Sequence, residues 1–303
     1  MRNVSVVIST YSKERARYLS ECIRSLKNQS LKPDEIILVL DPFPDLIEFY
    51  KSRFSNDVLI VVSEKRGLSN ARNAGIKNAN GDIICFLDDD AVADKKWLEN
   101  LVKNYADKNV VGVGGFIRPA WEQGAPKWFP EELNWIVGCS YKGLPEHKAM
   151  VRNPIGCNMS FRKAVFDKAG LFRADIGRFG TNLLASEETE ISIRILKNIE
   201  KSKIIYDPAA LVHHKIPKRR RSLKYVWVRS FYEGLSKAII TDESISSKEL
   251  ATESSYLKYI LSIAIPSRLK RIYEVEESSK ILVSIFSISA VFAGFVTGKL
   301  MRG

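Results

Sequence analysis

The stretch "GDIICFLDDDAVAD", residues 81–94, decides the fold. It contains an apolar run, residues 83–87, that ends in three consecutive aspartates, residues 88–90. A short continuous apolar run beside a glycine is typical of a strand that is buried on both faces. Three adjacent carboxylates repel one another, so we expect a cationic group to compensate them.

The first 120 residues alternate between strand-like and helix-like patterns. Apolar, β-branched runs predict the strands, and apolar positions at helical spacing predict the helices between them. The predicted strands are 4–9, 35–40, 58–62, 83–87 and 110–117, and the predicted helices are 19–29, 68–78 and 97–105. Nearly continuous apolar strands separated by amphipathic helices indicate an α/β fold, with a mainly parallel sheet and helices on both faces.

Polar residues follow three of these predicted strands. They are Thr10 with Tyr11, Asp41, and the aspartates that begin with Asp88. In a parallel α/β sheet the ligand binds beyond the carboxyl ends of the strands. Because three separate strands bring polar groups to this edge, we expect a functional site there.

The pair Asp88 and Asp90 has the spacing of a metal site. Carboxylates at the end of a buried strand can hold Mg²⁺ or Mn²⁺, and these ions also bind substrate phosphates. The alternative is a cluster of acids at a helix start. Asp94 is better placed to begin the next helix, so the aspartates favour a metal.

The segment "GLSNARNAGI", residues 67–76, indicates a phosphate-binding turn. Gly67 permits a tight turn, Ser69 or Asn70 is predicted to cap a helix, and Arg72 projects from its first turn. A helix N-terminus with a guanidinium group suits a diphosphate. The chain has no P-loop motif, and no G-x-G-x-x-G dinucleotide motif follows the first strand.

The segment "SEETEISIRI", residues 186–195, carries candidate bases. Ser186 is predicted to cap a helix whose first turn holds Glu187 and Glu188. Glu190 lies four residues before Arg194, which is the spacing of an ion pair on a helix surface. Glu187 or Glu188 could instead accept a proton from an attacking hydroxyl group.

The formal net charge of +12 is concentrated in one region, and residues 215–237 contain eight Lys or Arg and one acid. His213 and His214 precede the basic run, and one of them is a candidate metal or phosphate contact. The run favours an anionic partner, although a solvated face would show the same composition. We expect no nucleic-acid binding, because no such module is recognisable and acids at strand ends repel phosphates unless a metal intervenes.

Two further segments bear on the environment of the protein. Residues 119–135 hold three prolines, three tryptophans and Phe129, and either cap the core or line an acceptor groove. Residues 281–298 carry no charge and would extend for about 27 Å as a helix, close to the thickness of a bilayer core. Four scattered cysteines indicate a reducing compartment without disulfides, and no cleaved signal peptide is expected.

Together these motifs resemble family 2 glycosyltransferases of the GT-A fold. The matching segments are "VSVVISTYSKER", Asp41, "GLSNARNAGI", "GDIICFLDDDAVAD", "NPIGCNMSFRKAVFDKAGLF" and "SEETEISIRI", within about residues 4–235. The segments "APKWFPEELNWIVGC", "EETE" and "HHKIPKRRR" are similar to a narrower group, the glucosyl-dolichyl-phosphate glucuronosyltransferases of archaeal N-glycosylation.

The resemblance implies roles for residues of this chain. The nucleotide-sugar would be bound by Thr10, Tyr11, Asp41, Arg72, Asp88, Asp89 and Arg220. The metal, Mg²⁺ or Mn²⁺, would be held by Asp88, Asp90 and His214, with Asp90 as the more direct ligand and His213 as an alternative to His214. Glu188 occupies the position of the catalytic base, and Glu187 remains its alternative.

The resemblance also implies an activity and a location. The expected enzyme is a metal-dependent inverting hexosyltransferase that moves a sugar from a UDP-sugar, such as UDP-glucuronate, to a dolichyl- or polyprenyl-phosphate-linked saccharide in N-glycosylation. The alternatives are a glycosyltransferase that forms a polysaccharide or a polyprenyl-phosphate hexose, and a sugar nucleotidyltransferase. We expect a catalytic domain at 1–235, a helical linker at 236–278, and a transmembrane or membrane-associated helix at 279–300. Basic residues before that helix favour a catalytic domain on the cytoplasmic side of the cell membrane.

Overall fold

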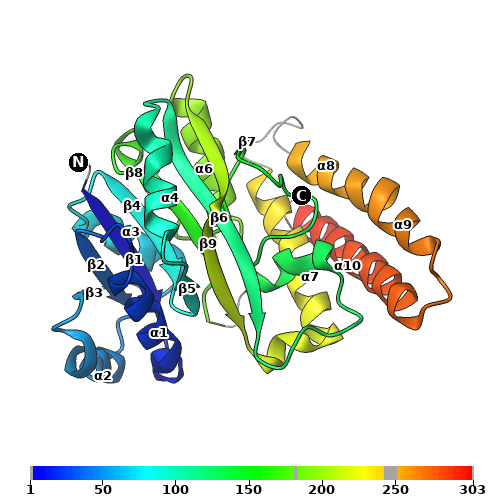
Figure 1. Ribbon diagram of the computed structural model, residues 1–303, viewed down its shortest axis with the longest axis horizontal. Helices are drawn as coiled ribbons and strands as arrows, with labels where there is room; N and C mark the ends of the chain where they lie inside the picture. The colour runs from blue at the N-terminus through cyan, green and yellow to red at the C-terminus, as the bar shows by residue number, and fades with distance from the viewer. Residues whose placement is uncertain (1–2, 181–182, 242–250, 302–303) are drawn as a thin grey trace. The chain divides into compact units, whose positions relative to one another are not determined.

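In the computed structural model, nine strands form one mixed sheet (Figure 1). The structure describes residues 3–180, 183–241 and 251–301. The main path through the sheet follows the order β3-β2-β1-β4-β8-β6-β9-β5, and β7 pairs with β9. The strands are β1 (Val4–Thr10), β2 (Glu35–Leu40), β3 (Leu59–Val62), β4 (Ile83–Asp88), β5 (Ala91–Ala93), β6 (Val110–Trp121), β7 (Ala149–Val151), β8 (Asn158–Arg162) and β9 (Lys203–Ile216).

The helices of the chain follow the strands in an alternating order up to β4. They are α1 (Ala16–Lys27), α2 (Pro44–Phe54), α3 (Leu68–Asn78), α4 (Trp97–Val102), α5 (Val165–Ala169), α6 (Glu187–Asn198), α7 (Leu223–Ile240), α8 (Ala251–Tyr259), α9 (Ile265–Leu269) and α10 (Val275–Leu300). The helix α2 was not predicted, although its buried residues Leu46, Tyr50 and Phe54 recur at every fourth position. The segment predicted as one helix over 97–105 is α4 followed by a 3₁₀ segment, Lys103–Ala106.

The first four strands of the path are parallel, as their apolar runs predicted. β1 lies between β2 and β4, with Val7 beside Ile37 and Phe86. Alternate residues of these strands point to opposite faces. Val7 and Phe86 join one buried cluster with residues of α3, α5 and α6. On the other face, the amide of Gln29 donates to the carbonyl of Asp94 and so ties the end of α1 to the start of α4.

Beyond β4 the sheet becomes antiparallel. β8 pairs with β4 and β6, and β5 pairs with β9. Only two residues, Asp89 and Asp90, lie between the end of β4 and the start of β5, so the chain turns back sharply there. The pairing of β5 with β9 then sets Ala91 opposite His214. This turn positions the histidine beside the aspartates, although Asp90 and His214 are 124 positions apart in sequence.

The described residues form two compact units. The first comprises residues 1–118, 145–182 and 187–215, and the second comprises 119–144, 183–186 and 216–303. Both units draw on separate stretches of the chain, whereas the sequence analysis expected one continuous domain over 1–235. The predicted boundary at 235 stays a prediction, and part of the predicted linker, residues 242–250, lies outside the described residues.

In the second unit, α7 and α10 run parallel and pack at very short range (Figure 1). The hydroxyl groups of Ser230 and Ser287 are 2.8 Å apart. A Cβ added to Gly294 would come within 1.9 Å of the carbonyl oxygen of Phe231, so only glycine fits there. The spacing of Ala290, Gly294 and Gly298 on α10 is met on α7 by Ser230, Gly234 and Ala238. Small residues at every fourth position allow this close approach of two helix backbones.

The two helices differ in their charge. α10 has 26 residues and a mean hydropathy of 2.1 over its most apolar stretch, and it exposes large side chains such as Leu282 and Phe292. α7 instead carries an internal ion cluster. The guanidinium of Arg229 lies 3.1 Å from Glu233, whose other oxygen lies 3.5 Å from Lys237. Partial burial acts to raise the pKa of the half-buried Glu233 carboxyl, but the neighbouring cations lower it below its ordinary value.

Candidate functional site

The polar residues predicted at strand ends do share one edge of the sheet. Thr10 is the last residue of β1 and pairs with Leu40, the residue before Asp41. Asp88 ends β4 and pairs with Ser9. Thr10 and Asp41 are buried, whereas the Tyr11 ring is exposed. The parallel register of β2, β1 and β4 therefore brings these three strand ends together in the first unit.

Two of the three aspartates are compensated by Arg15, which the sequence analysis did not single out. The Arg15 guanidinium donates two hydrogen bonds to Asp89, one of them at 2.6 Å, and lies 2.7 Å from Asp90. Burial raises the pKa of Asp89, although the guanidinium acts against this. Burial would lower the pKa of Arg15, but Asp89 and Asp90 raise it well above its ordinary value. The cationic group that the three aspartates were expected to need is thus, for Asp89 and Asp90, the side chain of Arg15.

Asp90 also contacts His214. The imidazole Nε2 lies 3.0 Å from the second carboxylate oxygen of Asp90, and both side chains are buried. His213 neighbours His214 on β9, so strand alternation turns it to the opposite face. His213 is half-buried, and its pKa is lowered by burial and by the nearby Arg118. Of the two histidines, only His214 lies against the aspartates.

A mixed set of metal-ligand atoms converges beside this pair. One potential ligand atom each from Asp88, Cys157 and His214 lies within 4.8 Å of the other two. A divalent ion bound to these three groups would need ligand atoms at this separation, because metal–ligand bonds are about 2.0–2.6 Å long. The donor set of carboxylate, thiol and imidazole therefore fits a divalent metal. Cys157 was not predicted as a ligand, because it stands alone in the sequence.

The two candidate bases lie in different environments. Arg72 donates a hydrogen bond of 2.7 Å to Glu187, and both side chains are almost fully buried. The same guanidinium donates to the Gly156 carbonyl and lies 4.0 Å from Asp88. Glu188, one position further along α6, is only partly buried. Glu187 is held in the interior by Arg72, whereas the partly exposed Glu188 is the more accessible of the two to a substrate.

Asp41 lies beside a cluster of aromatic and cationic side chains. Its carboxylate accepts a hydrogen bond of 3.3 Å from the Gly67 amide, and burial raises its pKa. The Arg66 guanidinium lies 4.5 Å from the Phe43 ring and 5.2 Å from the Phe179 ring. The sequence analysis missed this cluster because its members come from three loops. Flat apolar and guanidinium surfaces beside a carboxylate suit a nucleobase.

The helix caps predicted near the site are wrong. Ser69 donates to the Ile176 carbonyl and Asn70 to the Arg66 carbonyl, and α3 instead begins after Gly67, whose φ of 110° favours glycine. The Ser186 hydroxyl is buried without a hydrogen-bond partner in the described part of the chain. In contrast, the predicted ion pair between Glu190 and Arg194 is confirmed at 2.7 Å.

Arg220 belongs to the second unit, so its predicted contact with the nucleotide stays a prediction. It is buried and donates a hydrogen bond of 3.2 Å to the Val137 carbonyl. Its sequence neighbours line a cavity of about 760 Å³ in the same unit. The lining residues are Pro126, Trp128, Lys218, Arg219, Arg221 and Ser222. An aromatic wall with three cationic side chains suits a ligand that carries an anionic group.

The aromatic segment at 119–135 is in part core and in part cavity wall, and its role in an acceptor groove stays a prediction. Phe129 is buried against Trp121, with ring centroids 5.3 Å apart, and so caps the core. Trp128 instead lines the basic cavity.

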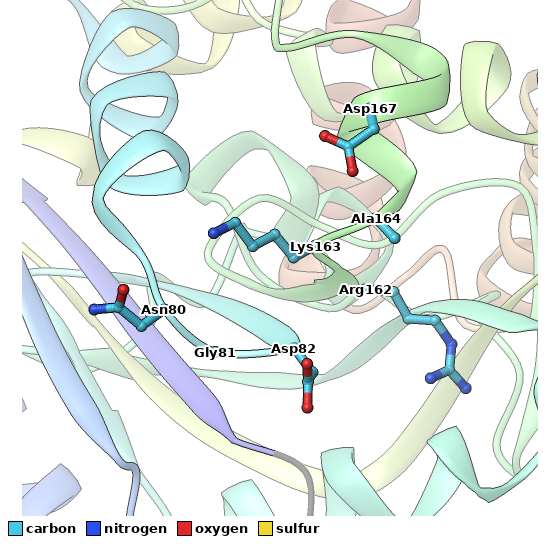
Figure 2. Close-up of a pocket in the computed structure, with 7 residues that line it drawn as sticks. All are labelled: Asn80, Gly81, Asp82, Arg162, Lys163, Ala164 and Asp167. Carbon is cyan, nitrogen blue, oxygen red and sulfur yellow. The ribbon is translucent and has the colours of Figure 1, made fainter.

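Another cavity, of about 510 Å³, lies at the opposite ends of the strands (Figure 2). Its lining includes Asp82 just before β4 and Arg162 at the end of β8. Figure 2 shows the Arg162 and Lys163 side chains pointing away from each other. Both are engaged by backbone carbonyls, those of Val110 and Ala79 respectively. With its cations directed elsewhere, this cavity lacks the convergent groups of the strand-end site.

Comparison with known proteins identifies relatives of the whole chain. The sequence profile of "Glycosyl transferase family 2" matches residues 5–170. The chain is 33% identical to the glucosyl-dolichyl phosphate glucuronosyltransferase of Haloferax volcanii over 304 aligned residues, which cover 98% of this chain and 96% of that protein. It is 26% identical to the succinoglycan biosynthesis protein ExoM of Rhizobium meliloti, over 77% of this chain and 73% of that protein.

A solved structure shares the fold. The chain is similar to GalNAc-T7, whose crystal structure contains UDP, GalNAc and Mn²⁺, with a TM-score of 0.54 and 17% sequence identity. The similarity covers 87% of this chain and 57% of GalNAc-T7.

Arg15 provides a direct test of the charge balance at this edge. Replacing it with alanine leaves two buried carboxylates without their cation, so we expect Arg15→Ala to lower the free energy of unfolding by about 3–5 kcal/mol. Denaturant unfolding followed by tryptophan fluorescence measures the change. The matched control is Arg17→Ala, since Arg17 is exposed and its pair with Glu21 should contribute at most about 1 kcal/mol. Equal losses in the two variants would contradict this account.

Proposed function

Since the chain belongs to the family 2 glycosyltransferases, we propose that its strand-end site binds a UDP-sugar and a divalent cation, and that it glycosylates a lipid-linked acceptor. The observation that carries the proposal is the convergence of Asp88, Cys157 and His214 at the edge that also holds Asp41. The similarity in fold to a structure that contains UDP and Mn²⁺ supports it, as does the activity of the Haloferax relative.

The nucleoside is bound between the ends of β1 and β2. Asp41 accepts a hydrogen bond from an N–H of the base, and Thr10 lies at the neighbouring strand end. The base packs on the surface formed by Arg66, Phe43 and Phe179, whose exposed rings offer stacking area. Arg72 does not reach the nucleotide in this proposal, because Glu187 and the Gly156 carbonyl occupy its guanidinium.

The diphosphate lies where Asp88 ends β4. Asp88, His214 and Cys157 would hold the divalent cation, and Asp90 contacts the imidazole of His214. When bound, such an ion supplies positive charge against the negative charge that builds on the departing diphosphate. Asp89 takes no part in this contact, because Arg15 holds both of its oxygens.

Glu188 accepts the proton of the acceptor hydroxyl. The oxygen then attacks the anomeric carbon from the face opposite the nucleotide, while the bond between that carbon and the diphosphate oxygen breaks. The electron pair of the broken bond leaves with UDP, and the configuration at the anomeric carbon inverts. The transition state has oxocarbenium character, as in glycoside hydrolysis. A general base of this kind typically contributes about 10²–10⁴-fold to the rate.

We therefore expect Glu188→Gln to lower kcat by about 10²–10⁴-fold while leaving the KM of the donor nearly unchanged. Glutamine keeps the shape of the side chain but cannot take the proton. The assay follows sugar transfer from a panel of UDP-sugars, including UDP-glucuronate, to polyprenyl-phosphate glucose, with and without EDTA. Glu190→Gln is the matched control, because Glu190 is paired with Arg194 on the same helix. Full activity in Glu188→Gln, or activity that EDTA does not change, would contradict the proposal.

The basic cavity of the second unit suits the phosphate of the acceptor. Its cations Lys218, Arg219 and Arg221 stand beside the indole of Trp128, and the exposed Leu223 and Trp227 follow on α7. A polyprenyl phosphate presents the same combination, an anionic group joined to a long apolar chain.

Arg219 tests this placement, because it is exposed and its loss should not disturb the core. We expect Arg219→Ala to raise the KM of the lipid-linked acceptor by about 10-fold, the effect of one charge-assisted hydrogen bond of about 1.5 kcal/mol, with the donor KM unchanged. Lys65→Ala, at another exposed cation, serves as the control. A rise in the donor KM instead would assign the cavity to the nucleotide.

We also propose that the second unit lies in the plane of the membrane surface, without crossing it. α10 is about 39 Å long and is the one helix of the described residues that is long and apolar enough to cross. However, α7 runs alongside it, and α7 carries Arg229, Glu233 and Lys237. Each ionised side chain at the centre of a membrane helix costs about 2.5–3.5 kcal/mol. If the exposed apolar face of α10 instead lies on the membrane surface, the charged side chains of α7 stay out of the bilayer core and this cost is avoided.

Cysteine labelling distinguishes the two arrangements. The native cysteines are all buried, whereas Tyr273 and Met301, at the two ends of α10, are exposed. In sealed inverted vesicles from expressing cells, we expect an impermeant maleimide to label Tyr273→Cys and Met301→Cys equally. If one of them reacts only after detergent opens the vesicles, α10 crosses the bilayer.

A further inference from the structure

The thiol of Cys157 faces the same space as the carboxylate of Asp88 and the imidazole of His214. One ligand atom from each residue lies within 4.8 Å of the other two. Cys157 and His214 are buried, and Asp88 remains partly exposed. The three residues come from three different strand ends, so their convergence is a product of the sheet topology.

Cys157 is held in a turn with little freedom. The next residue, Asn158, begins β8 and donates hydrogen bonds to the carbonyls of Ala210 and Phe116. Its side-chain oxygen accepts a hydrogen bond of 2.8 Å from the Trp97 indole. On the other side, the Gly156 carbonyl accepts from Arg72. Both sequence neighbours of Cys157 are therefore held by hydrogen bonds. The position of the sulfur is thus set by the fold and does not depend on a bound ligand.

Asp90, the second aspartate of the D-x-D pair, is less available than Asp88 as a metal ligand. One oxygen of Asp90 contacts Arg15 at 2.7 Å, and the other lies 3.0 Å from His214. Both oxygens of Asp90 are thus engaged, whereas the sulfur of Cys157 lies within 4.8 Å of the ligand atoms of Asp88 and His214. Among the three other cysteines, Cys22 and Cys85 lie in the core, where burial raises the pKa of each thiol, and Cys139 belongs to the second unit.

We infer that Cys157 is a direct protein ligand of the metal, and that it gives the site a preference for thiophilic divalent ions such as Zn²⁺ and Cd²⁺ over Mg²⁺. Magnesium prefers oxygen ligands in octahedral geometry, whereas thiolate and imidazole select zinc-like ions. Binding converts the thiol to a thiolate and releases one proton to solvent. The inference uses the metal site of the proposed function, but its test needs neither nucleotide nor sugar.

Cadmium titration of the purified full-length protein tests the sulfur bond directly. A thiolate bound to Cd²⁺ gives an ultraviolet charge-transfer band that oxygen and nitrogen ligands do not give. We expect the band to saturate at one equivalent in the wild-type protein and in Cys139→Ser, the control in the other unit. We expect Cys157→Ser to lose the band and to bind Cd²⁺ at least about 10-fold more weakly, since loss of even an outer partner has this effect at metal sites.

X-ray absorption on the zinc-loaded wild-type protein tests the inference without any variant. A sulfur ligand at about 2.3 Å supports it, and a shell of only nitrogen and oxygen at about 2.0–2.1 Å overturns it. A band that persists in Cys157→Ser also overturns it. If the sulfur bond is present but no UDP-sugar is turned over, the proposed function fails and the metal assignment stands. If transfer occurs but no sulfur is bound, the reverse holds.

Discussion

The compensation of Asp89 and Asp90 by Arg15 governs the rest of the site. Two buried carboxylates side by side would be strongly unfavourable without a cation, and the guanidinium reaches both of them from the segment after β1. This contact fixes the sharp turn between β4 and β5. That turn lets β5 pair with β9, and the pairing delivers His214 to Asp90. Asp88, the first of the three aspartates, remains partly exposed at the end of β4.

A second charged pair follows the same principle. Arg72 pairs with Glu187 in the interior, and the adjacent Glu188, proposed as the base, is more exposed. Arg15 holds two acids in the interior and Arg72 holds one, and the acid beside each group, Asp88 or Glu188, is more exposed. The roles proposed for Asp88 and Glu188 rest on this difference in exposure, because a carboxylate buried against a guanidinium is less accessible to a ligand or a substrate.

The sequence was most informative about features that depend on local residue patterns. The four parallel strands, the edge at which Thr10, Asp41 and Asp88 meet, and the GT-A fold followed from apolar runs and motif order, and the structure and the comparisons confirm them. What could not be predicted depends on long-range pairing. Arg15 meets Asp89 across 74 positions, and Cys157 reaches Asp88 through the antiparallel pairing of β8 with β4. The caps at Ser69 and Ser186 failed for the same reason, since tertiary contacts set those loops.

The parallel packing of α7 and α10 has a consequence for how the C-terminus can be altered. Where two helix backbones meet through glycine and serine, the remaining helix has no large side chains that could cover its exposed backbone when the other helix is removed. Deleting α10 would bare the groove around Gly234 and the apolar residues next to it, within the same unit that holds the basic cavity. The helix α10 is therefore one half of a packed helix pair. A variant that lacks it would lose the exposed apolar side chains of α10, but it would expose the apolar surface of α7 that α10 covers.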